Sequence, residues 1–157
     1  MFVPNRIFCR MNNEMDWLHA IVMFVLSIAL QVFVMPYVMT QQPEHVYFTL
    51  SQLYMGVFMG AAMVAVDAIL HPTPVWVWFL SIGVAGAAVA AYRYQFGITD
   101  REWMREMIPH HSMALLTSPK HTQSLNPFVQ RLAEQIVVSQ SREIAEMQLQ
   151  LRTMPAR

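Results

Sequence analysis

Two adjacent histidines, His110 and His111, follow a pair of methionines, Met104 and Met107, in a stretch of helical character. At 3.6 residues per turn, Met104, Met107 and His111 fall on one stripe of a helix, and His110 lies beside that stripe. Thioether and imidazole groups side by side are the ligands that a soft metal ion prefers, copper(I) above all. The same pattern is also typical of a helix seam that contains Met and His and binds no metal.

A second helical stretch carries the counterparts of these side chains. Gln140 occupies a position where an apolar residue is expected, Glu143 flanks it, and Met147 follows one turn later. In an antiparallel hairpin these groups would face the first helix near the histidines, where Glu143 could bind an ion or orient an imidazole. A histidine hydrogen bond without metal is the alternative. The apolar seam has spacings of four and three residues: Ala133, Val137, Gln140, Ile144, Met147 and Leu151.

Capping signals set the limits of the two helices that would carry these groups. Thr99 followed by Glu102 is a capping box, which predicts a helix from Asp100 to about residue 117 with a kink at Pro109. Asn126 followed by proline predicts the start of a second helix, which continues to about residue 152. The polar segment 118–126 connects them. The pattern predicts a helical hairpin.

The composition places this hairpin on a membrane anchor. Hydrophobic residues make up 55% of the 157 residues and charged residues 13%, about half the charged share of a soluble domain. Three apolar runs are each long enough to cross a hydrocarbon core about 30 Å thick, and Pro36 is expected to kink or close the first. We therefore predict an all-α chain with a polar segment 1–16, a transmembrane region 17–96 (helices at about 17–39, 46–70 and 75–96) and a hairpin over 97–157.

Charge and cysteine content exclude several classes. The formal net charge is zero, so nothing indicates a nucleic-acid partner. The single cysteine excludes an intramolecular disulfide and a cysteine-based zinc cluster. Arginines near the membrane are balanced between the two ends, so charge does not predict the orientation.

The apolar runs contain further chemistry-bearing residues. The second run has Met and ionisable residues four positions apart, which could form a thioether path for copper(I) that ends at an ionisable pair; simple packing is the alternative. His19 and Met23 have the same spacing on the first run, and the third run, around Gly83, is rich in small residues that allow close helix packing. The second-run stripe consists of Met55, Met59, Met63, Asp67 and His71.

Two motifs, Met107-Ile-Pro-His-His111 with Ala114 and Gln140-Ser-Arg-Glu143-Ile-Ala-Glu-Met147, resemble the paired signatures of the DUF305 family. The resemblance covers about residues 100–152, and both motifs occur in the right order. Soluble members of the family are ferritin-like helical bundles, some of them implicated in copper binding and copper resistance outside the cytoplasm. The preceding three-helix arrangement resembles a membrane-anchored branch of the family.

This resemblance implies a metal site, with copper, Cu(I) above all, as the expected ion. It also implies a bacterial-type inner membrane with the hairpin on the periplasmic side. The chain departs from the family pattern at Thr117, where many members have methionine, and at Met113, where a small residue is common. The implied site residues are Met107, His110, His111, Glu143 and Met147, and the weaker candidates are Met104, Met113, His121 and Gln140.

We expect a binding protein and no enzyme. The ferritin-like analogy suggests a diiron site, but Glu102 and Glu143 are not followed by the histidine three residues later that such sites need. Copper sequestration or hand-over is the leading function. The alternative is a metal-free membrane assembly module, in which His–Gln or His–Glu pairs specify the register of the helices. A third hypothesis is a transport subunit that uses the Met stripe. Because a hairpin of about 55 residues is too small for a self-sufficient core, we expect a homo-oligomer that completes a four-helix bundle.

Overall fold

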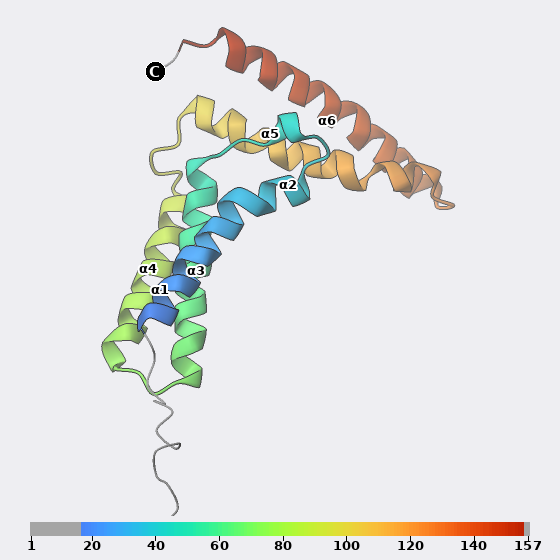
Figure 1. Cartoon of the computed structure of the whole chain (residues 1–157). Coiled ribbons are helices and arrows are strands. Elements are labelled where there is room, and N and C mark those ends of the chain that lie inside the picture. The colour runs from blue at the N-terminus through green and yellow to red at the C-terminus, as the bar shows by residue number, and fades with distance from the viewer. Residues whose placement is uncertain (1–16, 156–157) are drawn as a thin grey trace, which may run out of the picture.

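The computed structural model describes residues 17–155, which are helical and contain no strand (Figure 1). Three long apolar helices come first and two more helices follow, which confirms the predicted all-α fold. The predicted polar segment 1–16 lies outside the described residues. In chain order the elements are α1 (Trp17–Ala29), the π-helical turn η1 (Leu30–Val34), α2 (Met35–Met39), the 3-10 turn η2 (Pro43–His45), α3 (Leu50–Leu70), α4 (Val75–Arg93), α5 (Asp100–Thr117), the 3-10 turn η3 (Pro119–Gln123) and α6 (Pro127–Thr153).

Three stretches are long and apolar enough to cross a membrane: Trp17–Met39, Leu50–Leu70 and Val75–Arg93. Of the 18 most apolar consecutive residues in each stretch, only 6%, 28% and 17%, respectively, are buried inside the chain. Soluble monomers rarely expose apolar patches of this extent. The outward faces of these helices are therefore suited to contact with lipid.

Two helix ends differ from the predicted ones for local reasons. α3 begins at Leu50 rather than at about residue 46, because Thr49 caps it: the Thr49 hydroxyl accepts from the Gln52 amide, and the Gln52 side chain accepts from the Thr49 amide. α4 ends at Arg93 rather than at about residue 96, because the backbone turns left-handed at Gln95, which has a φ of +53°, and again at Gly97, which has a φ of +70°.

The first span contains one π-helical turn directly before Pro36. Proline has no amide hydrogen, and its ring would clash with the carbonyl oxygen four residues earlier in a regular helix. The Met35 amide instead donates to the carbonyl of Leu30, five residues back. A widened turn therefore accommodates Pro36, and the helix ends at Met39, shortly after the proline, as predicted.

Close helix packing in the membrane region depends on two glycines of α3, which packs against both α1 and α4. A Cβ atom at Gly60 would lie 2.7 Å from Phe24 Cδ2 on α1, and one at Gly56 would lie 3.2 Å from Ile28 Cα. Around Gly83 on α4, the sequence predicted a close approach, but a Cβ there meets nothing within 4 Å. On α4 the buried small residues are Ser81 and Ala88, whereas the close approach of a glycine to a neighbouring backbone occurs on α3.

The hairpin of α5 and α6 lies across one end of the apolar helices (Figure 1). Its core joins Ile108 and Leu115 of α5 to Ile144 of α6, and these three side chains are between 0% and 6% exposed. The predicted seam of α6 is confirmed, because Ala133 and Ile144 are buried and three other seam residues pack on this core. Those three residues are Val137, Met147 and Leu151.

The segment 40–49 between α2 and α3 attaches the hairpin to the apolar helices. The Ser112 hydroxyl on α5 is fully buried and accepts from the Gln41 amide at 2.8 Å. It also bonds to Nδ1 of the buried His45 at 2.8 Å. Because the Ser112 oxygen accepts from the Gln41 amide, the hydroxyl can donate its own hydrogen to Nδ1 of His45. Nδ1 can accept that hydrogen only when it carries none itself, as in a neutral His45.

We expect this attachment to weaken in acid. Burial lowers the pKa of His45 below its ordinary value of 6.5, and the neighbouring Glu44 charge opposes that shift. As the pH falls, His45 of the unfolded chain therefore binds a proton at a higher pH than His45 of the folded chain. The contribution of neutral His45 to the free energy of unfolding is thus complete above about pH 6.5 and is lost as the pH falls below that value. Thermal unfolding in mild detergent at pH 7.5 and pH 5.5 should show a smaller acid-induced fall in Tm for His45→Gln than for the wild type. An equal fall in both proteins would contradict this assignment.

Candidate metal centre

His111 is held between two hydrogen-bond acceptors, one on each helix of the hairpin. Its Nδ1 lies 2.7 Å from the Met107 carbonyl oxygen, and its Nε2 lies 2.7 Å from Oε2 of Glu143. A carbonyl oxygen can only accept, so Nδ1 carries the hydrogen, and a neutral ring then has a lone pair at Nε2. At 2.7 Å, Nε2 and Oε2 are joined by a hydrogen bond, with the hydrogen on one atom or the other. A metal ion bonded to both atoms, at about 2.0–2.2 Å from each, would take the place of that hydrogen only if the two atoms moved apart.

The methionines of the predicted site flank this pair. Met107 is half-buried one turn before His111, and Met147 is half-buried one turn after Glu143, against the hairpin core. Each helix thus has a methionine one turn away from its member of the His111–Glu143 contact. The weaker candidates are spread out: Met104 is buried, Met113 and Gln140 are half-buried, and His121 is exposed in η3.

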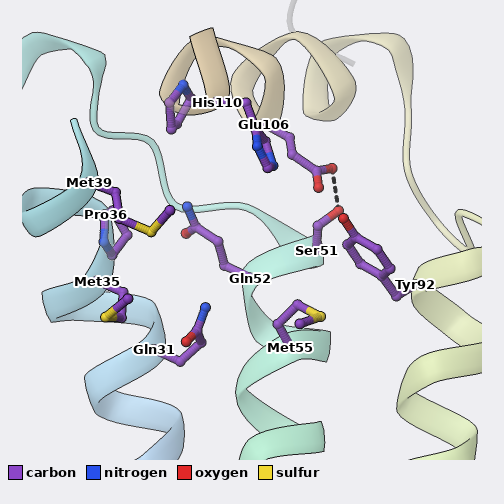
Figure 2. A pocket seen from close by; sticks show the side chains of 11 residues that line it. Gln31, Met35, Pro36, Met39, Ser51, Gln52, Met55, Tyr92, Glu106 and His110 are labelled. Atoms are coloured by element: carbon purple, nitrogen blue, oxygen red, sulfur yellow. Dashed lines mark hydrogen bonds between the residues drawn. The ribbon is translucent and has the colours of Figure 1, made fainter. Parts of the chain in front are cut away.

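His110 does not share this environment. It is exposed and lines a pocket between α2, α3 and α5, whereas His111 faces α6 (Figure 2). Successive residues of a helix point about 100° apart, and α5 runs through Pro109 as one continuous helix. The structure therefore places the two imidazoles in different surroundings, His110 at the pocket and His111 against α6.

The ligand types in the hairpin favour a soft ion over zinc. Within residues 17–155, no group of three or more His, Cys, Asp and Glu side chains is placed to hold a metal ion. Structural zinc sites need four such ligands. An ion at His111 and Glu143 would have to complete its coordination with thioethers, which copper(I) accepts readily.

The predicted Met stripe of α3 divides into separate environments. Asp67 is buried, and its carboxylate lies 3.1 Å from Nδ1 of His71 and 3.6 Å from Nδ1 of His19 on α1. The sequence paired Asp67 with His71 but gave no signal for the contact with His19. Met59 is 42% exposed, whereas Met55 lines the pocket beside His110. These residues therefore border different surroundings along α3.

Sequence reasoning also missed a buried acidic residue in the pocket. Glu106 on α5 is 6% exposed, accepts a hydrogen bond from the Ser51 hydroxyl of α3, and has Tyr92 beside it (Figure 2). Ser51 and Glu106 are 55 positions apart in the chain. Helical periodicity carries no signal for a pairing at that separation.

Comparisons with known proteins agree with the motifs of the hairpin. The profile of the family described as "Domain of unknown function (DUF305)" matches residues 88–152. An uncharacterized protein of Acanthamoeba polyphaga mimivirus is 32% identical over 103 residues, which cover 62% of this chain and 68% of that protein. No solved structure matches the chain. On the family profile and this relative together, the chain belongs to the DUF305 family.

Proposed function

We propose that this protein is a membrane-anchored binding protein that holds copper(I) in its hairpin, for sequestration or hand-over at the extracytoplasmic face of the membrane. The observation that carries the proposal is the 2.7 Å approach of His111 Nε2 to the Glu143 carboxylate. Imidazole nitrogen and carboxylate oxygen are both metal ligands, and the hairpin brings one of each, from different helices, to the same point. The three long apolar helices support the membrane anchor.

The surroundings of His111 prepare it to act as a ligand. Metal-binding histidines usually donate their second ring hydrogen to a carbonyl or carboxylate oxygen, which fixes the tautomer and the ring orientation. The Met107 carbonyl serves this purpose for His111. Copper(I) would replace the proton at Nε2, with the thioethers of Met107 and Met147 as further ligands and Glu143 in support. His110, which the family resemblance includes in the site, is turned toward the pocket.

A titration of the full-length protein in mild detergent tests this proposal. Copper(I) is added in competition with a chromophoric chelator, and we expect His111→Ala to abolish competition at the hairpin. Glu143→Gln should weaken binding about 10–100-fold, as is usual for groups that support a metal-bound histidine. The matched control is Glu146→Gln on the same helix, where the exposed Glu146 pairs with Arg142 at 3.3 Å. Equal affinities for Glu143→Gln and Glu146→Gln would contradict the site.

The same pair of glutamate variants separates this proposal from its alternative. In a metal-free assembly module, the His111–Glu143 hydrogen bond would only fix the register of the two helices. An amide in place of the Glu143 carboxylate can still donate to Nε2, so register and thermal stability would survive Glu143→Gln. Unchanged stability together with weakened copper binding therefore supports the metal site. Absence of competition by the wild type would leave only the assembly role.

We also propose that the hairpins of two chains pair. Two helices are too few for a four-helix bundle, and α6 keeps several large apolar side chains exposed on its outer surface. A second hairpin would cover them. A monomeric mass at micromolar protein in mild detergent would count against pairing. The exposed apolar residues of α6 are Phe128 (66%), Leu132 (43%), Val138 (71%) and Leu149 (61%).

A further inference from the structure

We infer that His19, Asp67 and His71 form a proton-binding site, which joins α1 to α3 at the end of the membrane region away from the hairpin. The site shares no residue with the proposed metal centre and does not depend on the proposed function. It rests on the distances between the three side chains, on the burial of Asp67 and on one carboxylate oxygen that lacks a hydrogen-bond donor.

The three side chains meet where the first span begins and the second span ends. Figure 1 shows the hairpin at one end of the apolar helices and the turn between α3 and α4 at the other. The stacked indole rings of Trp17 and Trp76, with centroids 5.2 Å apart, belong to the first residues of α1 and α4 at this same end. Tryptophan is typical of the boundary between membrane and water. The cluster therefore lies close to the aqueous phase on the side opposite the hairpin.

The carboxylate of this cluster is buried, whereas both imidazoles reach the surface. The Asp67 side chain is 10% exposed, compared with 53% for His19 and 39% for His71. A buried carboxylate is costly unless a positive charge or hydrogen-bond donors compensate it. An ionisable residue within a span is for this reason a candidate functional residue. Here the two exposed rings give protons from water access to the buried acid.

The charged surroundings of Asp67 consist of the two histidines alone within residues 17–155. α1 contributes His19, and α3 itself contributes His71. α4 places Val77 and Trp78 in or against the apolar core at this end, and its ionisable residues are in its last turn, at 92–93. In this part of the chain, the three groups are also not placed to hold a metal ion. A proton is the cation that the arrangement can accept.

The hydrogen bonds leave one acceptor of Asp67 empty. Nδ1 of His71 lies 3.1 Å from Oδ1 and 3.2 Å from the Asp67 carbonyl oxygen. Both oxygens accept, so this Nδ1 carries a hydrogen. Oδ2 is buried without a hydrogen-bond partner, which is true of no other buried side-chain nitrogen or oxygen in residues 17–155. Nδ1 of His19 on α1 lies 3.6 Å from Oδ2, beyond the length of a hydrogen bond.

One proton taken up from water fills this gap. With an ionised carboxylate and two neutral imidazoles, the cluster carries one negative charge in apolar surroundings. Protonated His19 has a hydrogen on both ring nitrogens, so its Nδ1 donates to Oδ2 and the cluster becomes neutral. The closed contact thus binds one proton more than the open one, and a fall in pH favours it. Histidine is the side chain that changes its charge between about pH 5 and 8.

Hydrogen exchange of the full-length protein in mild detergent tests the inference, with each rate divided by the intrinsic exchange rate at the same pH. We expect the amides of residues 21–27 on α1 to exchange about tenfold more slowly at pH 5.5 than at pH 7.5, the usual effect of a hydrogen bond to a charged group on an opening equilibrium. The amides of residues 80–88 on α4 should show no such change. This comparison needs no variant.

Two substitutions show whether the response belongs to this cluster. His19→Gln and Asp67→Asn each keep a side chain that forms hydrogen bonds but does not titrate, so the slowing in acid should disappear in both. His45→Gln is the matched control, because it removes a titratable histidine at the hairpin end and should leave the slowing in place. Three results would overturn the site: no pH response in the wild type, an undiminished response in His19→Gln or Asp67→Asn, and loss of the response in His45→Gln.

Discussion

Replacing Gly60 with leucine should separate α1 from α3 and lower the thermal stability of the protein more than any other substitution in the membrane region. A Cβ at this position would lie 2.7 Å from a ring carbon of Phe24 and 3.0 Å from its carbonyl oxygen. The ring can rotate away, but the carbonyl oxygen belongs to the α1 backbone and can yield only if the helix moves. Overpacking costs about 1–3 kcal/mol in cores that can adjust, and a backbone contact leaves less room to adjust.

The measurement is thermal unfolding in mild detergent, followed by helical circular dichroism. A loss of 1 kcal/mol corresponds to a fall in Tm of about 2–4 °C in a chain of this size. Gly83→Leu on α4 is the matched control, since nothing lies within 4 Å of a Cβ there. Because α1 continues through η1 into α2, Gly60→Leu should also displace Met35 and Met39, which line the pocket. Equal Tm values for the two variants would show that the close approach is not essential.

Ser112→Ala should detach the segment 40–49 from α5, which is the second large effect that we expect. The hydroxyl is fully buried and bonds both the Gln41 amide and His45 Nδ1 at 2.8 Å. Its removal leaves the Gln41 amide and the buried His45 imidazole without this partner, and a buried polar group left unpaired costs about 1–3 kcal/mol. Both groups lie on the same short connection. The loss should therefore be concentrated there.

Hydrogen exchange is the measurement of choice for Ser112→Ala. Amides of residues 40–49 should exchange faster, whereas those in the middle of α3 and α4 should be little affected. Ser141→Ala is the control, because that hydroxyl is exposed and bonds only to the Val137 carbonyl of its own helix. Unchanged exchange in segment 40–49 would mean that other contacts hold it on the hairpin.

The sequence predicted the features of this chain that depend on neighbours within a few turns. Thr99 and Asn126 cap α5 and α6 as expected, because a cap involves residues two or three positions apart. The seam around Ile144 follows helical periodicity, and an antiparallel hairpin then brings Glu143 to His111. Roles in metal binding remain predictions.

Contacts between distant segments could not be predicted in this way. Ser51 with Glu106, His45 with Ser112 and His19 with Asp67 join different helices, and periodicity within one helix contains no information about them. The small residues near Gly83 suggested close packing by composition, although the approach occurs at Gly60, where the partner helix happens to pass. Composition shows which residues permit contact, but the arrangement of the helices decides which of them are used.

The adjacency of His110 and His111 has a mechanical consequence. The two side chains project from one rigid helix into different surroundings and are joined by a single peptide unit, so any rotation of α5 about its axis moves both at once. A rotation that changes the distance of His111 from Glu143 also moves His110 relative to α2 and α3, which border the same pocket. α5 therefore couples any movement at its contact with α6 to the end of the membrane helices.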